Sequence, residues 1–174
     1  MSNAKMILNQ QLSWTGERYL PEIHGNIEAE HLHRYLFAMQ FTVGKRVLDI
    51  ASGEGYGSAL LAANANTVVG VDIDAEAVLH ANSKYRISNL DFKIGSCASI
   101  PLDDQSVDIV VSFETLEHHP QHELMMREIK RVLIPGGILI ISTPDKLEYT
   151  DNAKTQNKYH VKELYRDEFE KLLA

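Results

Sequence analysis

The chain has 174 residues, of which 24% are charged, and a formal net charge of −7 at pH 7. This length suits one domain with a sizeable core, and the acidic balance argues against broad binding to nucleic-acid phosphates. No apolar run reaches the roughly 20 residues of a bilayer span, no secretory signal is evident, and Cys97 is the only cysteine, so a cytoplasmic protein without an intrachain disulfide is expected.

The N-terminal region divides into three parts. Residues 1–4 resemble a cloning remnant, which leaves residues 5–174 as a single domain. Residues 5–26 have no clean periodicity and are interpreted as an arm, either a surface arm held by its aromatic side chains or a lid over a cofactor. Apolar residues at helical spacing predict a helix over residues 27–41.

A glycine-rich turn follows the first apolar strand. Residues 47–57 read V-L-D-I-A-S-G-E-G-Y-G and lead into a good helix-forming sequence. Gly53, Gly55 and Gly57 alternate, which lets the backbone approach a ligand without Cβ clashes. Asp49 lies toward the carboxyl end of the strand, where open α/β sheets bind their ligands.

A second acid, Asp72, ends the next apolar strand at residues 67–71. It follows Gly53 by 19 residues, a spacing suited to binding ribose hydroxyls. The turn has the spacing G-x-G-x-G, whereas dinucleotide sites have G-x-G-x-x-G. The carboxylate of Asp49 would repel a phosphate but suits a cation, so the two acids predict a pocket for a positively charged, phosphate-free nucleoside.

The rest of the chain alternates strands and helices, which predicts a parallel, doubly wound α/β sheet. Its five strands are expected in the order 3-2-1-4-5. Asp74 is expected to cap the helix after the second strand. The later elements are predicted as strands at residues 90–94, 107–113 and 138–142, a helix at 121–133, a polar loop at 145–158 and a short helix from about 167 through 173.

Several motifs in this order resemble the class I S-adenosylmethionine (SAM) methyltransferases of the small-molecule type. These are the glycine turn, Asp72, L-E-H at residues 116–118 and P-G-G at 135–137. Ala51 stands where the family usually has glycine, and Ser96 where it usually has aspartate. The resemblance implies a Rossmann-like fold that normally has two more strands. The fifth strand would then be an edge that self-association or a fused C-terminal region covers.

The resemblance also implies SAM as cofactor and S-adenosylhomocysteine as product. Asp72 is expected to bind the ribose hydroxyls, Asp49 and the turn backbone to fix the methionine end, and Ile73 to lie against the adenine. The twelve candidate cofactor residues are Asp49, Ala51, Gly53, Gly55, Tyr56, Asp72, Ile73, Ser96, Cys97, Ala98, Phe113 and Glu114.

Three adjacent polar residues after the fourth strand are the catalytic candidates. A hydroxyl acceptor needs a base, and His118 is the first candidate because histidine titrates near neutrality. His119 and Glu117 come next, and the alternative is that His118 only lines the pocket. No metal site is predicted, because consecutive residues point in different directions and no further ligand stands at a useful spacing.

The predicted function is methyl transfer from SAM to a small-molecule or glycan acceptor, at a hydroxyl oxygen. Residues 15–22 and 157–169 resemble methyltransferase domains of bacterial surface-polysaccharide clusters, which favours a glycan. No N-P-P-Y motif is present, so a nucleic-acid substrate is not expected. Two alternatives stay open: an inactive SAM-binding fragment that acts as an interaction module, and an NAD-dependent oxidoreductase.

Overall fold

A computed structural model describes residues 26–154 and 156–174. Residues 1–4 and 5–25, interpreted above as a cloning remnant and most of an arm, lie outside this part of the chain. The described residues form a five-stranded sheet of order β3-β2-β1-β4-β5 in which every neighbouring pair is parallel. The predicted strand order is therefore confirmed. Over the same residues, no helix has both the length and the apolar character that crossing a bilayer requires.

The elements follow one another in strict alternation from β1 to β3, and again from β4 to β5. In chain order they are α2 (Asn26–Met39), β1 (Arg46–Ile50), α3 (Tyr56–Ala62), β2 (Thr67–Asp72), α4 (Ala75–Lys84), β3 (Leu90–Ile94), β4 (Val107–Phe113), a 3₁₀ turn (Leu116–His118), α5 (His122–Val132), β5 (Leu133–Ser142), a π-helical turn (Leu147–Asn152) and α6 (Arg166–Leu173).

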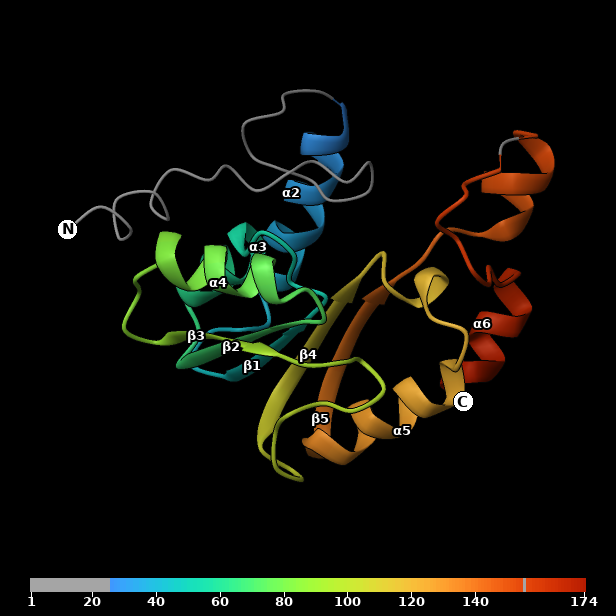
Figure 1. The fold of residues 1–174 in the computed structure, drawn as a ribbon. Coiled ribbons are helices and arrows are strands. Elements are labelled where there is room, and N and C mark those ends of the chain that lie inside the picture. Colours follow the sequence, from blue (N-terminus) through green and yellow to red (C-terminus); the bar gives the residue numbers. More distant parts are fainter. Residues whose placement is uncertain (1–25, 155) are drawn as a thin grey trace.

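Helices cover both faces of the sheet (Figure 1). Strand β1 shows how the two cores are divided, because its side chains alternate between the faces. Val47 packs with α2 and α3, whereas Leu48 and Ile50 pack with α5. A strand buried on both faces is apolar almost throughout, which is why β1 has no polar alternation and only Arg46 at its start and Asp49 as polar residues.

The boundaries of the middle elements agree closely with the sequence. β3 and β4 have the predicted limits, and Asp74 caps α4 by accepting a hydrogen bond from the backbone N–H of Glu76 at 2.9 Å. β5, however, begins at Leu133 instead of residue 138. Leu133 pairs with Val107 and Ile138 with Ile109, so the Pro-Gly-Gly segment forms an irregularity inside the strand.

The region after β5 is more ordered than its polar composition indicated. The segment predicted as a loop contains the π-helical turn Leu147–Asn152, and Asp145 Oδ1 accepts from the N–H of Leu147 at its start at 3.0 Å. The final helix is present as predicted. It begins one residue earlier than expected, at Arg166, where Glu168 accepts from the N–H of Tyr165 at 3.0 Å.

Candidate functional site

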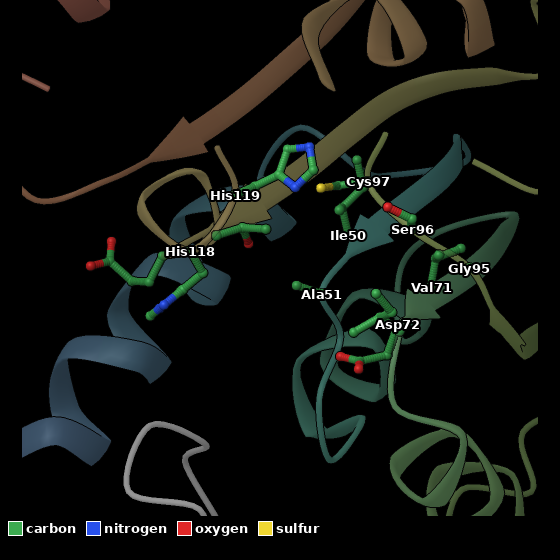
Figure 2. Close-up of a pocket in the computed structure, with 12 residues that line it drawn as sticks. Ile50, Ala51, Val71, Asp72, Gly95, Ser96, Cys97, His118 and His119 are labelled. Atoms are coloured by element: carbon green, nitrogen blue, oxygen red, sulfur yellow. The ribbon is translucent and has the colours of Figure 1, made fainter. Parts of the chain in front are cut away.

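A cavity of about 180 Å³ opens where the carboxyl ends of β1, β2, β3 and β4 meet (Figure 2). Each strand contributes the residues at or just beyond its tip, as expected for an open parallel sheet. The lining residues are Ile50, Ala51, Val71, Asp72, Ile73, Gly95, Ser96, Cys97, Glu114, Thr115, His118 and His119.

The glycine turn after β1 has an unusual backbone. Ala51 (φ 58°), Gly53 (φ 55°) and Gly55 (φ 96°) all adopt left-handed conformations, which turn the chain sharply between β1 and α3. A Cβ on Gly55 would lie 2.8 Å from the Cβ of Ala81 and from Cζ of Phe92. Gly55 is therefore required by packing against α4 and β3, while Ala51 forms part of the cavity wall.

Asp72 connects this turn to the tip of β2. Its Oδ2 accepts a hydrogen bond from the N–H of Gly53 at 2.7 Å, and its Oδ1 accepts from the N–H of Asp74 at 2.9 Å. A carboxylate has about four acceptor positions, so both oxygens retain capacity for hydroxyl donors of a ligand. The side chain lies in the cavity wall, as the sequence predicts for a ribose-binding acid.

Asp49 lies beneath the turn and is absent from the cavity wall. Its residue is 0% exposed, and its carboxylate accepts from Ser58 Oγ at 2.6 Å and from Tyr35 Oη at 3.2 and 3.3 Å. Burial raises its pKa to about 7, which the hydrogen bonds from Ser58 and Tyr35 oppose and the charge of Asp72 increases. Because Asp49 has no accessible surface, it makes no direct contact with the cavity in this conformation.

Six of the twelve candidate cofactor residues line the cavity, namely Ala51, Asp72, Ile73, Ser96, Cys97 and Glu114. Ile73 is 76% exposed, an unusual position for an isoleucine and a suitable one for covering a flat ring. Burial raises the pKa of the Cys97 thiol, so this residue contributes an uncharged surface.

The other six lie below or beside the cavity. Tyr56 packs edge-to-face on Tyr35, and its hydroxyl lies 3.0 Å from Nδ1 of His31. Phe113 packs edge-to-face on the same Tyr35 ring. Ala98 donates its N–H to Ser96 Oγ at 3.1 Å. Like Asp49, Gly53 and Gly55 described above, these residues do not line the cavity.

The three catalytic candidates occupy the 3₁₀ turn after β4 and the residue that follows it, and they face different directions. The side chain of His118 is 32% exposed and lines the cavity, and its Nδ1 lies 3.0 Å from the carbonyl oxygen of Tyr159. Figure 2 shows the ring of His119 beside Cys97, directed away from that of His118. Nε2 of His119 is buried and has no hydrogen-bond partner within residues 26–154 and 156–174.

Glu117 is the buried member of the three. Its side chain is 1% exposed, and Oε2 accepts from Thr143 Oγ1 at 3.0 Å. Burial raises the pKa of this carboxyl, and the negative charge of Glu114 adds to the increase, whereas His118 opposes it. Glu117 does not line the cavity.

Sequence reasoning missed two groups of residues. Glu54, which stands between Gly53 and Gly55, is buried and contacts Lys84 Nζ at 2.7 Å and Tyr85 Oη at 2.8 Å at the end of α4. His160 lies against His118, with ring centroids 5.1 Å apart, although the two are far apart in sequence. The carboxylate between two glycines was the only sequence signal for the contact of Glu54 with α4. No sequence pattern indicated the contact of His160 with His118.

The fold and the cavity together define a class. A parallel sheet of this order, a glycine turn after its central strand and an acid at the neighbouring tip are the features of a Rossmann-like protein that binds a nucleoside derivative. The model of a methyltransferase domain matches residues 48–141 of the chain.

Relatives of known sequence agree with this match. A protein of Mycolicibacterium smegmatis named as a probable S-adenosylmethionine-dependent methyltransferase is 35% identical, over 99% of this chain and 68% of its own length. Another of the same description, Rv3030 of Mycobacterium tuberculosis, is 36% identical over 93% of this chain and 60% of its own length. A fatty-acid O-methyltransferase of M. smegmatis is 28% identical over 65% of this chain and 44% of its own length.

Solved structures show the same fold. The YcgJ protein of Bacillus subtilis superposes with a TM-score of 0.73 at 23% identity, covering 82% of this chain and 66% of that one. The chain thus belongs to the class I SAM-dependent methyltransferases, and SAM is its cofactor. It spans between 60% and 68% of the two relatives with the same description.

Proposed function

We propose that this chain forms the SAM-binding core of an enzyme that methylates a hydroxyl oxygen of a small-molecule or glycan acceptor. The observation that carries the proposal is the position of Asp72, in the cavity wall and hydrogen-bonded to the glycine turn. In this reaction the hydroxyl oxygen attacks the methyl carbon, a C–O bond forms, and the C–S bond of the sulfonium breaks. The acceptor loses its proton, and S-adenosylhomocysteine leaves.

The cavity offers a suitable group for each part of SAM. Asp72 binds the ribose hydroxyls, Ile73 covers one face of the adenine, and Ser96 and Cys97 border its edge. The methionine end runs along the turn at Ala51. Its positive charges are stabilised by the acids near this end of the sheet. The lining residues agree with this, because they include the carboxylates of Asp72 and Glu114 and neither lysine nor arginine.

His118 is the candidate that faces the acceptor and assists the loss of its proton. Of the three polar residues it alone combines accessible side-chain surface with a position in the cavity wall and a ring fixed by a backbone carbonyl. Glu117 is shielded, and His119 lies on the Cys97 side. Positioning of the reactants supplies up to about 7–11 kcal/mol of the barrier reduction, and the proton acceptor about 10²–10⁴-fold in rate.

Two observations support the acceptor class. The fatty-acid O-methyltransferase among the relatives acts at oxygen, as its name states. The segment around residues 157–163, part of the stretch that resembles methyltransferases of polysaccharide clusters, contacts the catalytic turn: the N–H groups of Val161 and Lys162 donate to the carbonyl oxygen of Glu117 at 2.8 and 3.1 Å. We prefer a glycan hydroxyl as the acceptor because of the resemblance of this stretch to methyltransferases of polysaccharide clusters.

Calorimetric titration with S-adenosylhomocysteine tests the cofactor site. Asp72→Ala should weaken binding at least about tenfold, or 1.4 kcal/mol, while Asp103→Ala, which removes an exposed acid outside the cavity, should leave it unchanged. Equal affinities for wild type and Asp72→Ala would place the ribose elsewhere. An increase in melting temperature with NAD but not with S-adenosylhomocysteine would favour the oxidoreductase alternative.

Release of S-adenosylhomocysteine from SAM in the presence of sugar and glycan acceptors tests the reaction. Turnover that depends on a free hydroxyl, and that is lost when this hydroxyl is replaced by hydrogen, supports the proposal. Tight cofactor binding without turnover on any glycan, lipid or small hydroxyl compound would favour the inactive binding module.

A further inference from the structure

Three metal-ligating side chains meet beside the cavity. Glu117 and His118 come from the turn after β4, and His160 comes from the segment that precedes α6. One ligand atom of each lies within 4.8 Å of those of the other two, and His118 Nε2 is 4.0 Å from Glu117 Oε1. The fold thus joins residues that the sequence leaves far apart, which is why no metal site was expected from spacing alone.

This cluster is largely shielded from solvent. The side chain of Glu117 is 1% exposed and that of His160 is 6% exposed, whereas His118 retains 32%. Burying a carboxylate is costly unless a positive charge or several donors compensate for its lost hydration. A cation bound by all three side chains would provide that compensation.

Each histidine is oriented by a hydrogen bond at Nδ1. Nδ1 of His118 lies 3.0 Å from the carbonyl oxygen of Tyr159, which makes this nitrogen the donor. Nδ1 of His160 lies 2.5 Å from Glu163 Oε1, and Glu163 is held in turn by Thr150 Oγ1. Histidines that bind metals usually donate their second ring nitrogen to a carbonyl or a carboxylate in this way, which directs the Nε2 lone pair to the ion.

Further contacts agree with this tautomer and orient the carboxylate. Asn157 Nδ2 lies 3.1 Å from Nε2 of His160, and Asn157 Oδ1 accepts from the N–H of Tyr159, so the amide is the donor and Nε2 the acceptor. Thr143 binds Oε2 of Glu117, which turns Oε1 toward His118. A bound ion would take the place of the Asn157 amide at Nε2 of His160.

We propose that Glu117, His118 and His160 bind a divalent transition-metal ion of the zinc type. Two imidazoles and one carboxylate favour such ions over magnesium or calcium, which prefer oxygen ligands. The same donor set occurs in catalytic zinc sites, where a fourth position stays open. Zinc–ligand distances of about 2.0–2.2 Å place bound ligand atoms at most about 4 Å apart, so the side chains close by about 1 Å on binding.

The site goes beyond the proposed methyl transfer and exists independently of it, although His118 belongs to both. An ion on His118 occupies the lone pair that would otherwise take the acceptor proton. A hydroxyl bound at the open position would instead lose its proton more readily, because a divalent ion lowers the pKa of a bound hydroxyl. Metal binding would then change the role of His118 in the loss of the acceptor's proton, from taking the proton itself to binding the ion that lowers the pKa of the hydroxyl.

Calorimetry with zinc chloride on the chelator-treated, dialysed full chain tests the proposal, with magnesium chloride as the comparison ion. We expect one zinc ion per chain and at least about 100-fold weaker binding in His160→Ala, with about 10–100-fold weaker binding in Thr143→Val, which alters only the support of Glu117. His33→Ala, an exposed histidine on α2, is the matched control and should bind as the wild type does. The absorption spectrum of bound cobalt(II) should report mixed nitrogen and oxygen ligands.

Zinc affinity that is unchanged in His160→Ala, or absent in the wild type, would overturn the site, and so would preferential binding of magnesium. Titration of the same samples with S-adenosylhomocysteine separates this result from the proposed function. Lost zinc binding with retained cofactor binding in His160→Ala supports the metal site. Retained zinc binding in a wild type that does not bind S-adenosylhomocysteine would contradict the proposed function alone.

Discussion

The hydroxyl of Tyr35 donates to the carboxylate of Asp49, with Oη 3.2 and 3.3 Å from its two oxygens. Both residues are buried, so this contact joins α2 to the central strand β1 directly beneath the glycine turn. It also places the Tyr35 ring against Gly57 in the first turn of α3, the helix that follows the glycine turn.

The first prediction concerns Tyr35→Phe. The Tyr35 hydroxyl stabilises ionised Asp49 and so lowers the pKa of this carboxyl, which burial raises to about 7. Removal of the hydroxyl should therefore raise the pKa of Asp49 beyond this value. The variant should lose about 1.5–3 kcal/mol of unfolding free energy at pH 8, where the carboxylate is charged, and less at pH 5, where it is protonated. Urea unfolding at the two pH values measures this difference.

Tyr165→Phe provides the comparison, because its hydroxyl bonds Asp151 at the exposed surface. Tyr165→Phe should lower the free energy of unfolding by less than about 1 kcal/mol at both pH values. A cost for Tyr35→Phe that is the same at pH 5 and pH 8 would show that this hydroxyl does not stabilise the ionised form of Asp49.

The second prediction is a pH dependence that Asp49→Asn removes. Burial raises the pKa of Asp49 from 3.8 to about 7, so between these values the folded protein keeps a proton that the unfolded chain has lost. The contribution of Asp49 to the free energy of unfolding is therefore greatest below about pH 4 and falls as the pH rises to about 7. The total loss of stability over this range is on the order of 4 kcal/mol.

Other carboxyls titrate in the same range, so the informative quantity is the difference between wild type and Asp49→Asn. That difference should shift in favour of the variant from pH 4 to pH 7 and stay constant above pH 8. Unfolding free energies that keep a fixed difference across this range would place the pKa of Asp49 near its ordinary value.

The parts of the fold that local patterns determine could be predicted from the sequence. β3 and β4 have the expected limits, because short apolar runs between turn residues leave little freedom. The alternation of strands and helices predicted the parallel sheet, and the strand order agrees with the Rossmann-like fold that the resemblance implied. The glycine turn and Asp72 were recognisable for the same reason: their chemistry depends on nearby residues and on fixed spacings.

Contacts between distant segments could not be predicted in this way. The burial of Asp49 depends on Tyr35, which approaches from a helix that precedes the strand. The pairing of His160 with His118 depends on how the chain returns after β5, and that return depends on packing in three dimensions. A sequence pattern identifies which residues carry chemistry, but tertiary packing decides which of them meet.

The third prediction concerns Gly57→Ala, in the first turn of α3. A Cβ there would lie 2.0 Å from Cζ of Tyr35, and the ring is held by Asp49, so it cannot move away without breaking that bond. The helical preference for alanine returns about 1 kcal/mol, yet overpacking typically costs about 1–3 kcal/mol and more where the neighbour is fixed. We expect net destabilisation in urea unfolding, together with weaker binding of S-adenosylhomocysteine.

Gly44→Ala separates packing from backbone strain. Gly44 has φ +68°, but a Cβ there meets nothing within 4 Å, so its cost of about 1–2 kcal/mol comes from the backbone alone. This variant should leave cofactor binding unchanged. A stabilised Gly57→Ala would mean that α3 can move away from Tyr35.

The fourth prediction concerns His118→Ala and separates chemistry from cofactor binding. If His118 assists proton loss, as a base or as a ligand, its removal should lower turnover on a glycan hydroxyl by about 10²–10⁴-fold. The affinity for S-adenosylhomocysteine should change much less, because Asp72 and the turn backbone remain in place. His33→Ala, on an exposed side of α2, should alter neither quantity. A wild-type rate in His118→Ala would restrict this residue to lining the cavity, whereas a parallel loss of rate and cofactor affinity would show that its main role is to hold the cofactor.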